Sequence, residues 1–173
     1  IMHTEWLHTD CIATWHGVDV FSEEHWHLIG EYIAYAVQHG VNMILTPLFT
    51  PPLDTLIGGE RPTVQLVTVT KEQDNYSFDI TKLERWISLC QEKGVKYFEF
   101  SHLFTQWGAY HAPKIVAWED GQLKKIFGWE TDAHSSAYKD FLDQFLPRLV
   151  QFIKEHQLEK RCFFHISDEP SLG

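Results

Sequence analysis

Short apolar runs alternate with amphipathic helical segments along this chain, and this alternation restricts the folds that it can adopt. Residues 41–45 are predicted to form a buried strand, residues 95–100 and 161–166 the third and fourth strands, and residues 4–11 an earlier first strand. Between them, three segments repeat apolar residues at spacings of three and four, the period of one helix face. These stripes are Trp26, Ile29, Ile33 and Val37; Leu83, Trp86, Ile87 and Cys90; and Leu142, Phe145, Leu146, Leu149, Phe152 and Ile153. The pattern predicts an α/β fold with a parallel sheet.

Each predicted helix begins near a residue that can cap it. Ser22 precedes two glutamates, Asp79 precedes the second helix, and Ser135 or Ser136 starts the third. Their side-chain oxygens can accept hydrogen bonds from the free N–H groups of a first helical turn. Pro147 falls inside the third helix, so we expect a kink or a break there.

Two long segments that follow the second and third strands contain predicted hairpins. Residues 65–70 are expected to pair with 75–78, and residues 115–118 with 123–127 across a Glu-Asp-Gly turn. Long loops of this kind inside a compact domain are usually functional or carry their own small structure.

A (β/α)8 barrel is the architecture that fits this pattern best. The GxGxxG and P-loop sequences of nucleotide-binding doubly wound sheets are absent. A complete barrel takes about 250 residues. We therefore expect residues 1–173 to form a single domain, a TIM-barrel fragment of about the first four β/α units with long hairpin-bearing loops. A half barrel leaves its outer strands unpaired, so we also expect the fragment to form a homo-oligomer.

Charge and composition argue against several classes of partner. Asp and Glu number 24 against 14 Lys and Arg, and a formal net charge of -10 does not suit a nucleic-acid backbone. No apolar run approaches the roughly 20 residues of a membrane helix. The 3 cysteines are scattered, which favours a reducing compartment such as the cytoplasm over a disulfide framework. We expect no cofactor.

Polar residues gather at the predicted carboxyl ends of the strands, where a barrel carries its chemistry. They are His8 and Asp10 at the first end, Asn42 and Thr46 at the second, Glu99, Ser101 and His102 at the third, and His165, Asp168 and Glu169 at the fourth. The long loops begin at the same ends, as loops over an active site do.

The adjacent acids Asp168 and Glu169 are the sequence feature that indicates a catalytic chemistry most strongly. Neighbours on a regular strand point to opposite faces, so both can face one cavity only where the strand passes into a loop, which Pro170 favours. Two carboxyl groups in one site repel, so one retains a proton while the other stays ionised. That pairing suits cleavage of a glycosidic bond. The alternative is an exposed turn, because Asp and Pro are common turn residues.

Tryptophans on the predicted loops indicate a carbohydrate as the small-molecule partner, because sugar rings pack well on indole faces. They are Trp15, Trp107, Trp118 and Trp129, and each of them can equally serve to pack a loop against the barrel. We expect the sugar pocket to be lined by His8, Asp10, Glu99, His102, Gln106 and Trp107.

Histidines near the strand ends raise the alternative of a metal-dependent hydrolase. His8 lies close to Asp10 in the sequence, and His165 lies close to Asp168. No HExxH pattern is present, and histidine also serves as a core or sugar-binding residue. We therefore expect no metal.

Several runs spread over nearly the whole chain resemble the catalytic domain of glycoside hydrolase family 123, also called domain of unknown function 4091. They are Thr46-Pro47-Leu48-Phe49-Thr50-Pro51-Pro52-Leu53-Asp54-Thr55, Gly59-Glu60-Arg61-Pro62-Thr63-Val64-Gln65-Leu66-Val67, His102-Leu103-Phe104-Thr105-Gln106-Trp107-Gly108, Ala112-Pro113-Lys114, Phe127-Gly128-Trp129 and His165-Ile166-Ser167-Asp168-Glu169-Pro170. The resemblance covers the N-terminal half of that family's barrel, with the acid pair after the fourth strand.

The resemblance implies an exo-acting β-N-acetylgalactosaminidase, or hexosaminidase, that retains configuration by substrate assistance. Glu169 would be the general acid and base. Asp168 would orient the 2-acetamido group of the substrate, whose carbonyl oxygen attacks the anomeric carbon, so that no protein nucleophile is needed. Because the chain stops just after the pair, the fragment alone is expected to be incomplete. A non-catalytic carbohydrate-binding protein on the same scaffold is the alternative from another class.

Overall fold

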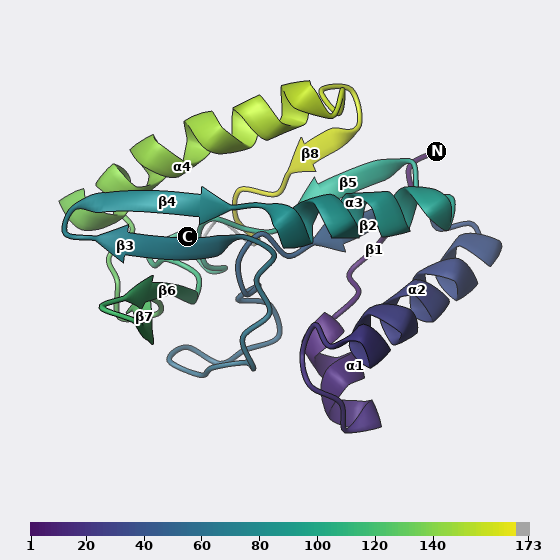
Figure 1. Ribbon diagram of the computed structural model, residues 1–173, viewed down its shortest axis with the longest axis horizontal. Helices are drawn as coiled ribbons and strands as arrows, with labels where there is room; N and C mark the ends of the chain where they lie inside the picture. Colours follow the sequence, from purple (N-terminus) through teal and green to yellow (C-terminus); the bar gives the residue numbers. More distant parts are fainter. Residues whose placement is uncertain (169–173) are drawn as a thin grey trace.

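Within residues 1–168, the part of the chain that the structure describes, the computed structural model has four helices and two four-stranded sheets (Figure 1). The helices are α1 (Thr9–His16), α2 (Glu23–Gln38), α3 (Thr81–Glu92) and α4 (Ser136–Glu155). The first sheet consists of β1 (Thr4–Glu5), β2 (Met43–Thr46), β5 (Tyr97–Phe100) and β8 (Cys162–Phe164). The second consists of β3 (Thr68–Glu72), β4 (Asn75–Asp79), β6 (Ile115–Glu119) and β7 (Gln122–Phe127). The fold is mixed α/β.

Neighbouring strands of the first sheet are all parallel, which confirms the parallel sheet predicted from the alternation. The order β1-β2-β5-β8 follows the chain. Thr46 lies opposite Phe100, and Phe100 lies opposite Phe164, so β2, β5 and β8 end at nearly the same level. The segments that follow these strands therefore meet at one edge of the sheet.

The first strand is shorter than predicted, and the strand assignment for residues 4–11 is wrong after Glu5. β1 has 2 residues, and the chain turns into α1 at Thr9. Asp10 lies in the first turn of α1, where a negative charge favours the helix dipole. Gly17 ends the helix in the left-handed conformation at φ 67°. His8 and Asp10 thus lie at the start of a helix and not on one face of a strand.

Both predicted hairpins form and together make the second sheet, although the first strand of the first hairpin spans Thr68–Glu72 and not residues 65–70. β3 pairs with β4 and β6 with β7 in antiparallel fashion, while β3 and β6 run parallel in the centre. Buried Gln65 joins the hairpins, because its amide donates to the carbonyl oxygens of Val67 and Val116, both at 2.9 Å, and accepts from the Val116 N–H at 3.0 Å. A buried amide requires such partners, so Gln65 fixes how the hairpins meet.

The predicted helix starts agree closely with the structure. Ser22 and Ser135 cap α2 and α4, and each hydroxyl accepts from the N–H three residues ahead, at 3.2 and 3.4 Å. Asp79 lies one position before the N-cap of α3, which is Ile80, but its Oδ1 still accepts from the N–H of Thr81 at 2.9 Å. All three capping oxygens therefore serve a first helical turn.

α4 continues through Pro147, so the predicted break is wrong. Proline removes the N–H that would bond to the carbonyl of Asp143. Pro147 and Asp143 are both exposed, and water can satisfy that carbonyl. Phe145 and Leu149 are buried on the opposite face and hold the helix against the core on both sides of the proline.

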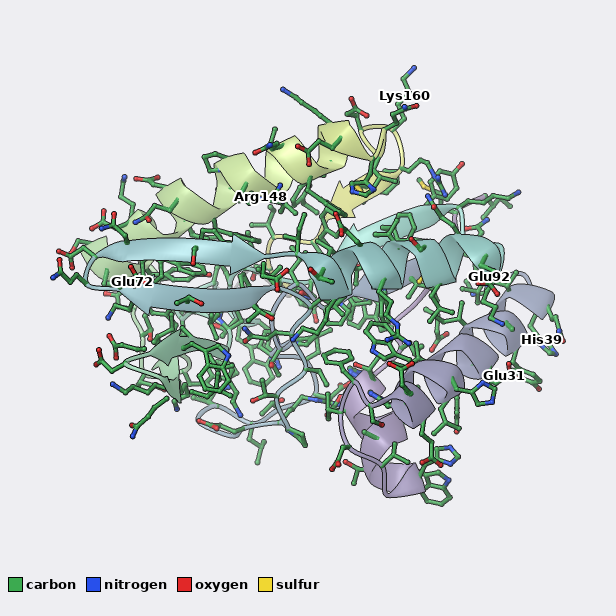
Figure 2. The ribbon with its side chains drawn as sticks, in the orientation of Figure 1. Glu31, His39, Glu72, Glu92, Arg148 and Lys160 are labelled. Atoms are coloured by element: carbon green, nitrogen blue, oxygen red, sulfur yellow. The ribbon has the colours of Figure 1, made fainter. Side chains whose placement is uncertain are left out.

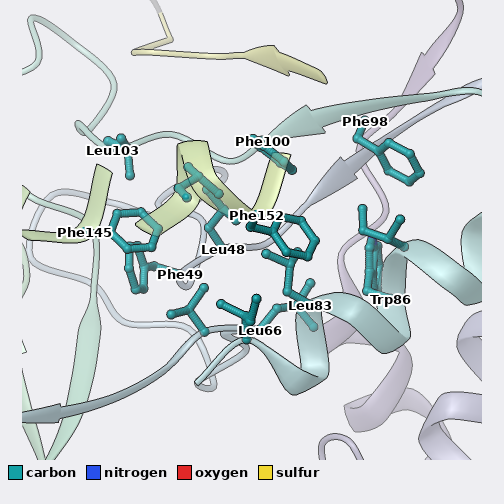
Figure 3. Close-up of a cluster of buried hydrophobic side chains, with 14 of the residues drawn as sticks. Leu48, Phe49, Leu66, Leu83, Trp86, Phe98, Phe100, Leu103, Phe145 and Phe152 are labelled. Carbon is teal, nitrogen blue, oxygen red and sulfur yellow. The ribbon is translucent and has the colours of Figure 1, made fainter. Parts of the chain in front are cut away.

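Aromatic side chains form the core between α4 and the second sheet. The ring centroid of Phe145 lies 4.9 Å from that of Phe49 and 5.2 Å from that of Phe78. Figure 3 shows Phe145 and Phe49 next to each other, with Leu83 and Trp86 of α3 closing the other side of the cluster. Buried aromatic rings contribute large apolar areas, so α4 is held mainly by this cluster.

Charged side chains cover the outer surface. In Figure 2, Glu31 on α2, Glu92 on α3 and Lys160 in the turn after α4 extend into solvent. Such positions avoid the cost of burying an unpaired charge. Among residues 1–168, no helix combines the length and the apolar character that crossing a bilayer demands.

Replacement of Phe145 by alanine tests the aromatic cluster. Phe145 is fully buried, so Phe145→Ala should lower the free energy of unfolding by about 3–5 kcal/mol through lost burial and a residual cavity. Val150→Ala on the same helix is the control, because Val150 is 45% exposed and should change stability by less than about 0.5 kcal/mol. Denaturant unfolding measures both. Equal effects of the two substitutions would contradict this account of the core.

Candidate active site

The carboxyl edge of the first sheet borders a hollow of about 310 Å³. The segments after β1, β2, β5 and β8 all contribute to its walls, which are formed by Trp6, Leu53, Asp54, Thr55, Leu56, Gln106, Trp107 and Asp168. Small-molecule sites usually measure about 300–1,000 Å³. The hollow therefore suits a ligand as small as one sugar ring.

Asp168 is held at the hollow by the loop after β5. Its backbone carbonyl accepts from the N–H of Trp107 at 3.2 Å, and the hydroxyl of Ser167 donates to the carbonyl of Thr105 at 3.0 Å. Carboxylate Oδ1 of Asp168 lies 3.9 Å from Nε2 of His165. One acid of the Asp-Glu pair thus lines the hollow beside an imidazole, while Glu169 lies outside the described residues.

Three donors surround the buried carboxylate of Glu99 on β5. Oε2 accepts from the hydroxyl of Thr4 at 2.7 Å, and Oε1 accepts from the indole N–H of Trp6 at 3.0 Å and from Nδ1–H of His165 at 2.7 Å. Burial favours a higher pKa for Glu99, but these hydrogen bonds and the nearby His165 outweigh burial and hold the pKa below its ordinary value. Glu99 is therefore an anion that ties β1, β5 and the segment after β8 together.

His102 lies behind the hollow as a neutral aromatic ring. It is fully buried, its centroid is 3.9 Å from that of His165 and 5.8 Å from that of Trp6, and neither ring nitrogen has a partner within residues 1–168. Burial, assisted by the charge of His165, lowers the pKa of His102 to about 4, although Glu99 opposes the change. At neutral pH the ring therefore packs against Trp6 and His165 without a charge.

His8 and Asp10 anchor one wall of the hollow instead of lining it. Buried Asp10 accepts two hydrogen bonds from Arg61, at 2.9 and 3.1 Å, and Nη1 of Arg61 donates to the carbonyl of Leu53 at 3.0 Å. Nε2 of His8 lies 2.9 Å from Oδ2 of Asp54. Leu53 and Asp54 border the hollow. His8 and Asp10 therefore affect the shape of the hollow indirectly, by holding the loop that carries these two residues.

Gln106 and Trp107 line the hollow directly. Gln106 is 6% exposed, its Nε2 lies 3.5 Å from the carbonyl oxygen of Thr55, and its Oε1 has no hydrogen-bond partner within the described chain. Trp107 adopts a φ of 61°, a strained conformation for a bulky residue, and its ring stacks on Trp129 with centroids 6.5 Å apart. Backbone strain of this kind clusters at functional sites.

Two parts of the hollow escaped the sequence analysis. Trp6 was placed inside a strand, although it directly follows β1, and a correct strand boundary would have put it at the carboxyl end. Residues 53–56 lie in a loop without regular structure, and their contribution depends on the contacts of Arg61 and His8.

Two carboxylates, those of Asp54 and Asp168, and two indoles line a sugar-sized space, and the imidazole of His165 lies beside Asp168. The indoles of Trp6 and Trp107 offer apolar faces for a ring, and Asp168 can accept a hydrogen bond or stabilise a positive charge. Among residues 1–168, no group of three His, Cys, Asp or Glu side chains is arranged to hold a metal ion.

The neutral state of His102 predicts a loss of stability in acid. The unfolded chain binds a proton near pH 6.5, whereas folded His102 does so only near pH 4, so stability is complete above pH 6.5 and falls as the pH approaches 4. The loss from this group is roughly 3 kcal/mol. Denaturant unfolding of His102→Phe should show a pH dependence weaker by about that amount. His134→Phe, at an exposed position, should behave as wild type, and an unchanged pH dependence in His102→Phe would refute the assignment.

Comparison with known proteins adds one assignment. No curated protein sequence matches the chain. Residues 6–172 match the family described as glycoside hydrolase 123, catalytic domain. This match includes every segment that borders the hollow, from Trp6 to Asp168. The chain therefore belongs to glycoside hydrolase family 123, in its catalytic domain.

Proposed function

We propose that this domain is the N-terminal half of a (β/α)8 barrel in an exo-acting β-N-acetylhexosaminidase that prefers N-acetylgalactosamine. The first sheet supports the barrel, because its four parallel strands follow one another in chain order and each is separated from the next by at least one helix. The carboxyl ends of these strands border the hollow, which is the position of a barrel active site.

The proposed reaction retains configuration in two steps. Glu169 donates a proton to the leaving oxygen while the carbonyl oxygen of the substrate's 2-acetamido group attacks the anomeric carbon and the glycosidic bond breaks. Asp168 orients the acetamido group and stabilises the positive charge of the oxazolinium ion. Water then attacks the anomeric carbon, Glu169 accepts its proton, and the acetamido group is restored.

The observation that carries the proposal is the carboxylate of Asp168 in a hollow walled by Trp6 and Trp107. An anion near a developing positive charge lowers the barrier, and indole faces suit the apolar face of a sugar ring. The same hollow could serve a carbohydrate-binding protein, so turnover decides between the two functions.

Glu99 and His165 have a positioning role in this proposal. The three donors around Glu99 occupy its carboxylate, so it is poorly placed to bind a sugar hydroxyl. By accepting from Nδ1–H of His165, Glu99 turns Nε2 toward Asp168. This contact fixes the imidazole beside the carboxylate that meets the acetamido group.

Asp168→Asn should lower kcat of the full-length protein on nitrophenyl β-N-acetylgalactosaminide by about 10²–10³-fold, because the amide cannot stabilise the oxazolinium charge. The nitrophenyl β-galactoside, which lacks the acetamido group, should not be hydrolysed by wild type. Asp120→Asn in an exposed turn is the matched control and should retain full activity. Sugar binding without turnover in wild type would establish the binding protein instead.

Glu99→Gln should lower kcat by about 10–100-fold and leave KM nearly unchanged, because a misplaced Asp168 affects the reacting geometry more than binding. The pH profile of kcat should also change, since the amide removes the charge next to His165. Glu72→Gln on β3, outside the hollow, is the control. A rise in KM alone would show that Glu99 binds substrate directly.

A further inference from the structure

The second sheet carries another hollow, of about 300 Å³, which shares no residue with the candidate active site. Its walls come from β3, β6 and β7, from the segment before α2 and from the first turn of α3. The residues that carry the argument are Phe21, Thr68, Lys82, Trp118 and Leu123.

Trp118 and Leu123 form an exposed apolar pair in this hollow. They lie opposite each other on β6 and β7, and they are 44% and 54% exposed. The helix tryptophans Trp26 and Trp86 are by contrast 3% and 0% exposed. An apolar pair beside a cavity marks a candidate ligand surface more strongly than a scattered exposed residue does.

Lys82 supplies a positive charge without a close ionic partner at the same hollow, within the described part of the chain. Its Nζ lies 5.4 Å from the centre of the Phe21 ring, and within residues 1–168 it makes no hydrogen bond or ion pair. Burial lowers the pKa of Lys82, and nearby Asp79 only partly offsets this effect. An ammonium group in this setting gains stability from a bound anion.

Phe21 is held rigidly under Lys82. Its φ is 59°, a strained value for an aromatic residue. The N–H of Phe21 donates to Nδ1 of His25 at 2.8 Å, and its ring stacks on Trp26 at 5.1 Å. The wall that faces Lys82 is therefore preorganised, which reduces the cost of binding.

We propose that this hollow is an accessory binding site for a sugar residue that carries a sulfate or carboxylate group. The sugar ring packs on the indole of Trp118, the anionic group meets the ammonium of Lys82, and the hydroxyl of Thr68 borders the ring. Aromatic stacking accounts for recognition of a ring, and the ammonium of Lys82, which makes no ion pair within residues 1–168, accounts for recognition of the anionic group. The site binds glycan without cleaving it, so it stands independently of the proposed reaction.

Fluorine NMR of the full-length protein labelled with fluorotryptophan tests the site directly. The resonance of Trp118 is identified by its loss in Trp118→Phe. Addition of N-acetylgalactosamine 6-sulfate should shift this resonance saturably at about millimolar concentrations, and unsulfated N-acetylgalactosamine should bind about tenfold more weakly. Shifts at Trp6 and Trp107 report the active-site hollow separately, so failure at one site does not hide the other.

Lys82→Gln should abolish the preference for the sulfated sugar and leave weak binding of the neutral sugar. Trp15→Ala, which removes an 83% exposed tryptophan from α1, should leave both affinities unchanged. Unshifted resonances of the other tryptophans verify that Lys82→Gln is folded. The proposal is overturned if the Trp118 resonance does not respond to the sulfated sugar, or if Lys82→Gln retains the preference.

Discussion

The buried carboxylate of Glu99 holds the carboxyl edge of the first sheet together. Its partners come from β1, from the residue after β1 and from the segment after β8, which are far apart in the sequence. An unpaired anion in this position would cost several kcal/mol, so each donor must stay in place. The same contacts fix Trp6 in the wall of the hollow and His165 beside Asp168, and the fold and the candidate site thus depend on one charge.

The buried ring next to Glu99 and His165, that of His102, carries no charge at neutral pH. His102 is neutral, so it adds no charge beside Glu99 and His165. Its ring instead fills the space between His165 and Trp6. A protonated His102 would be a buried charge without a hydrogen-bond partner in the described part of the chain, which explains why acid should lower the stability of the fold.

The sequence predicted the elements with strong local signals. The serine caps, both hairpins, the parallel sheet and the apolar stripes are present, except that Leu146 of the third stripe is 37% exposed, because periodicity and turn residues determine these features locally. The first strand was predicted too long, since Thr9–His16 satisfies a helical pattern that tertiary packing selects. The strand ends also indicated Asp168 and Glu99 as site residues. The positioning role of Glu99 could not be predicted, because it depends on donors 66 to 95 residues away in the chain that only the folded sheet brings near.

The loop that walls the hollow is held unequally along its length. At Leu53, Arg61 joins the loop carbonyl to buried Asp10, and loss of one partner of such a pair costs about 3–5 kcal/mol. The side chain of Asp54 is 75% exposed, so its contact with His8 contributes little to stability. Leu56 beyond it is 82% exposed. The loop is therefore held firmly at Leu53 and only weakly from Asp54 to Leu56.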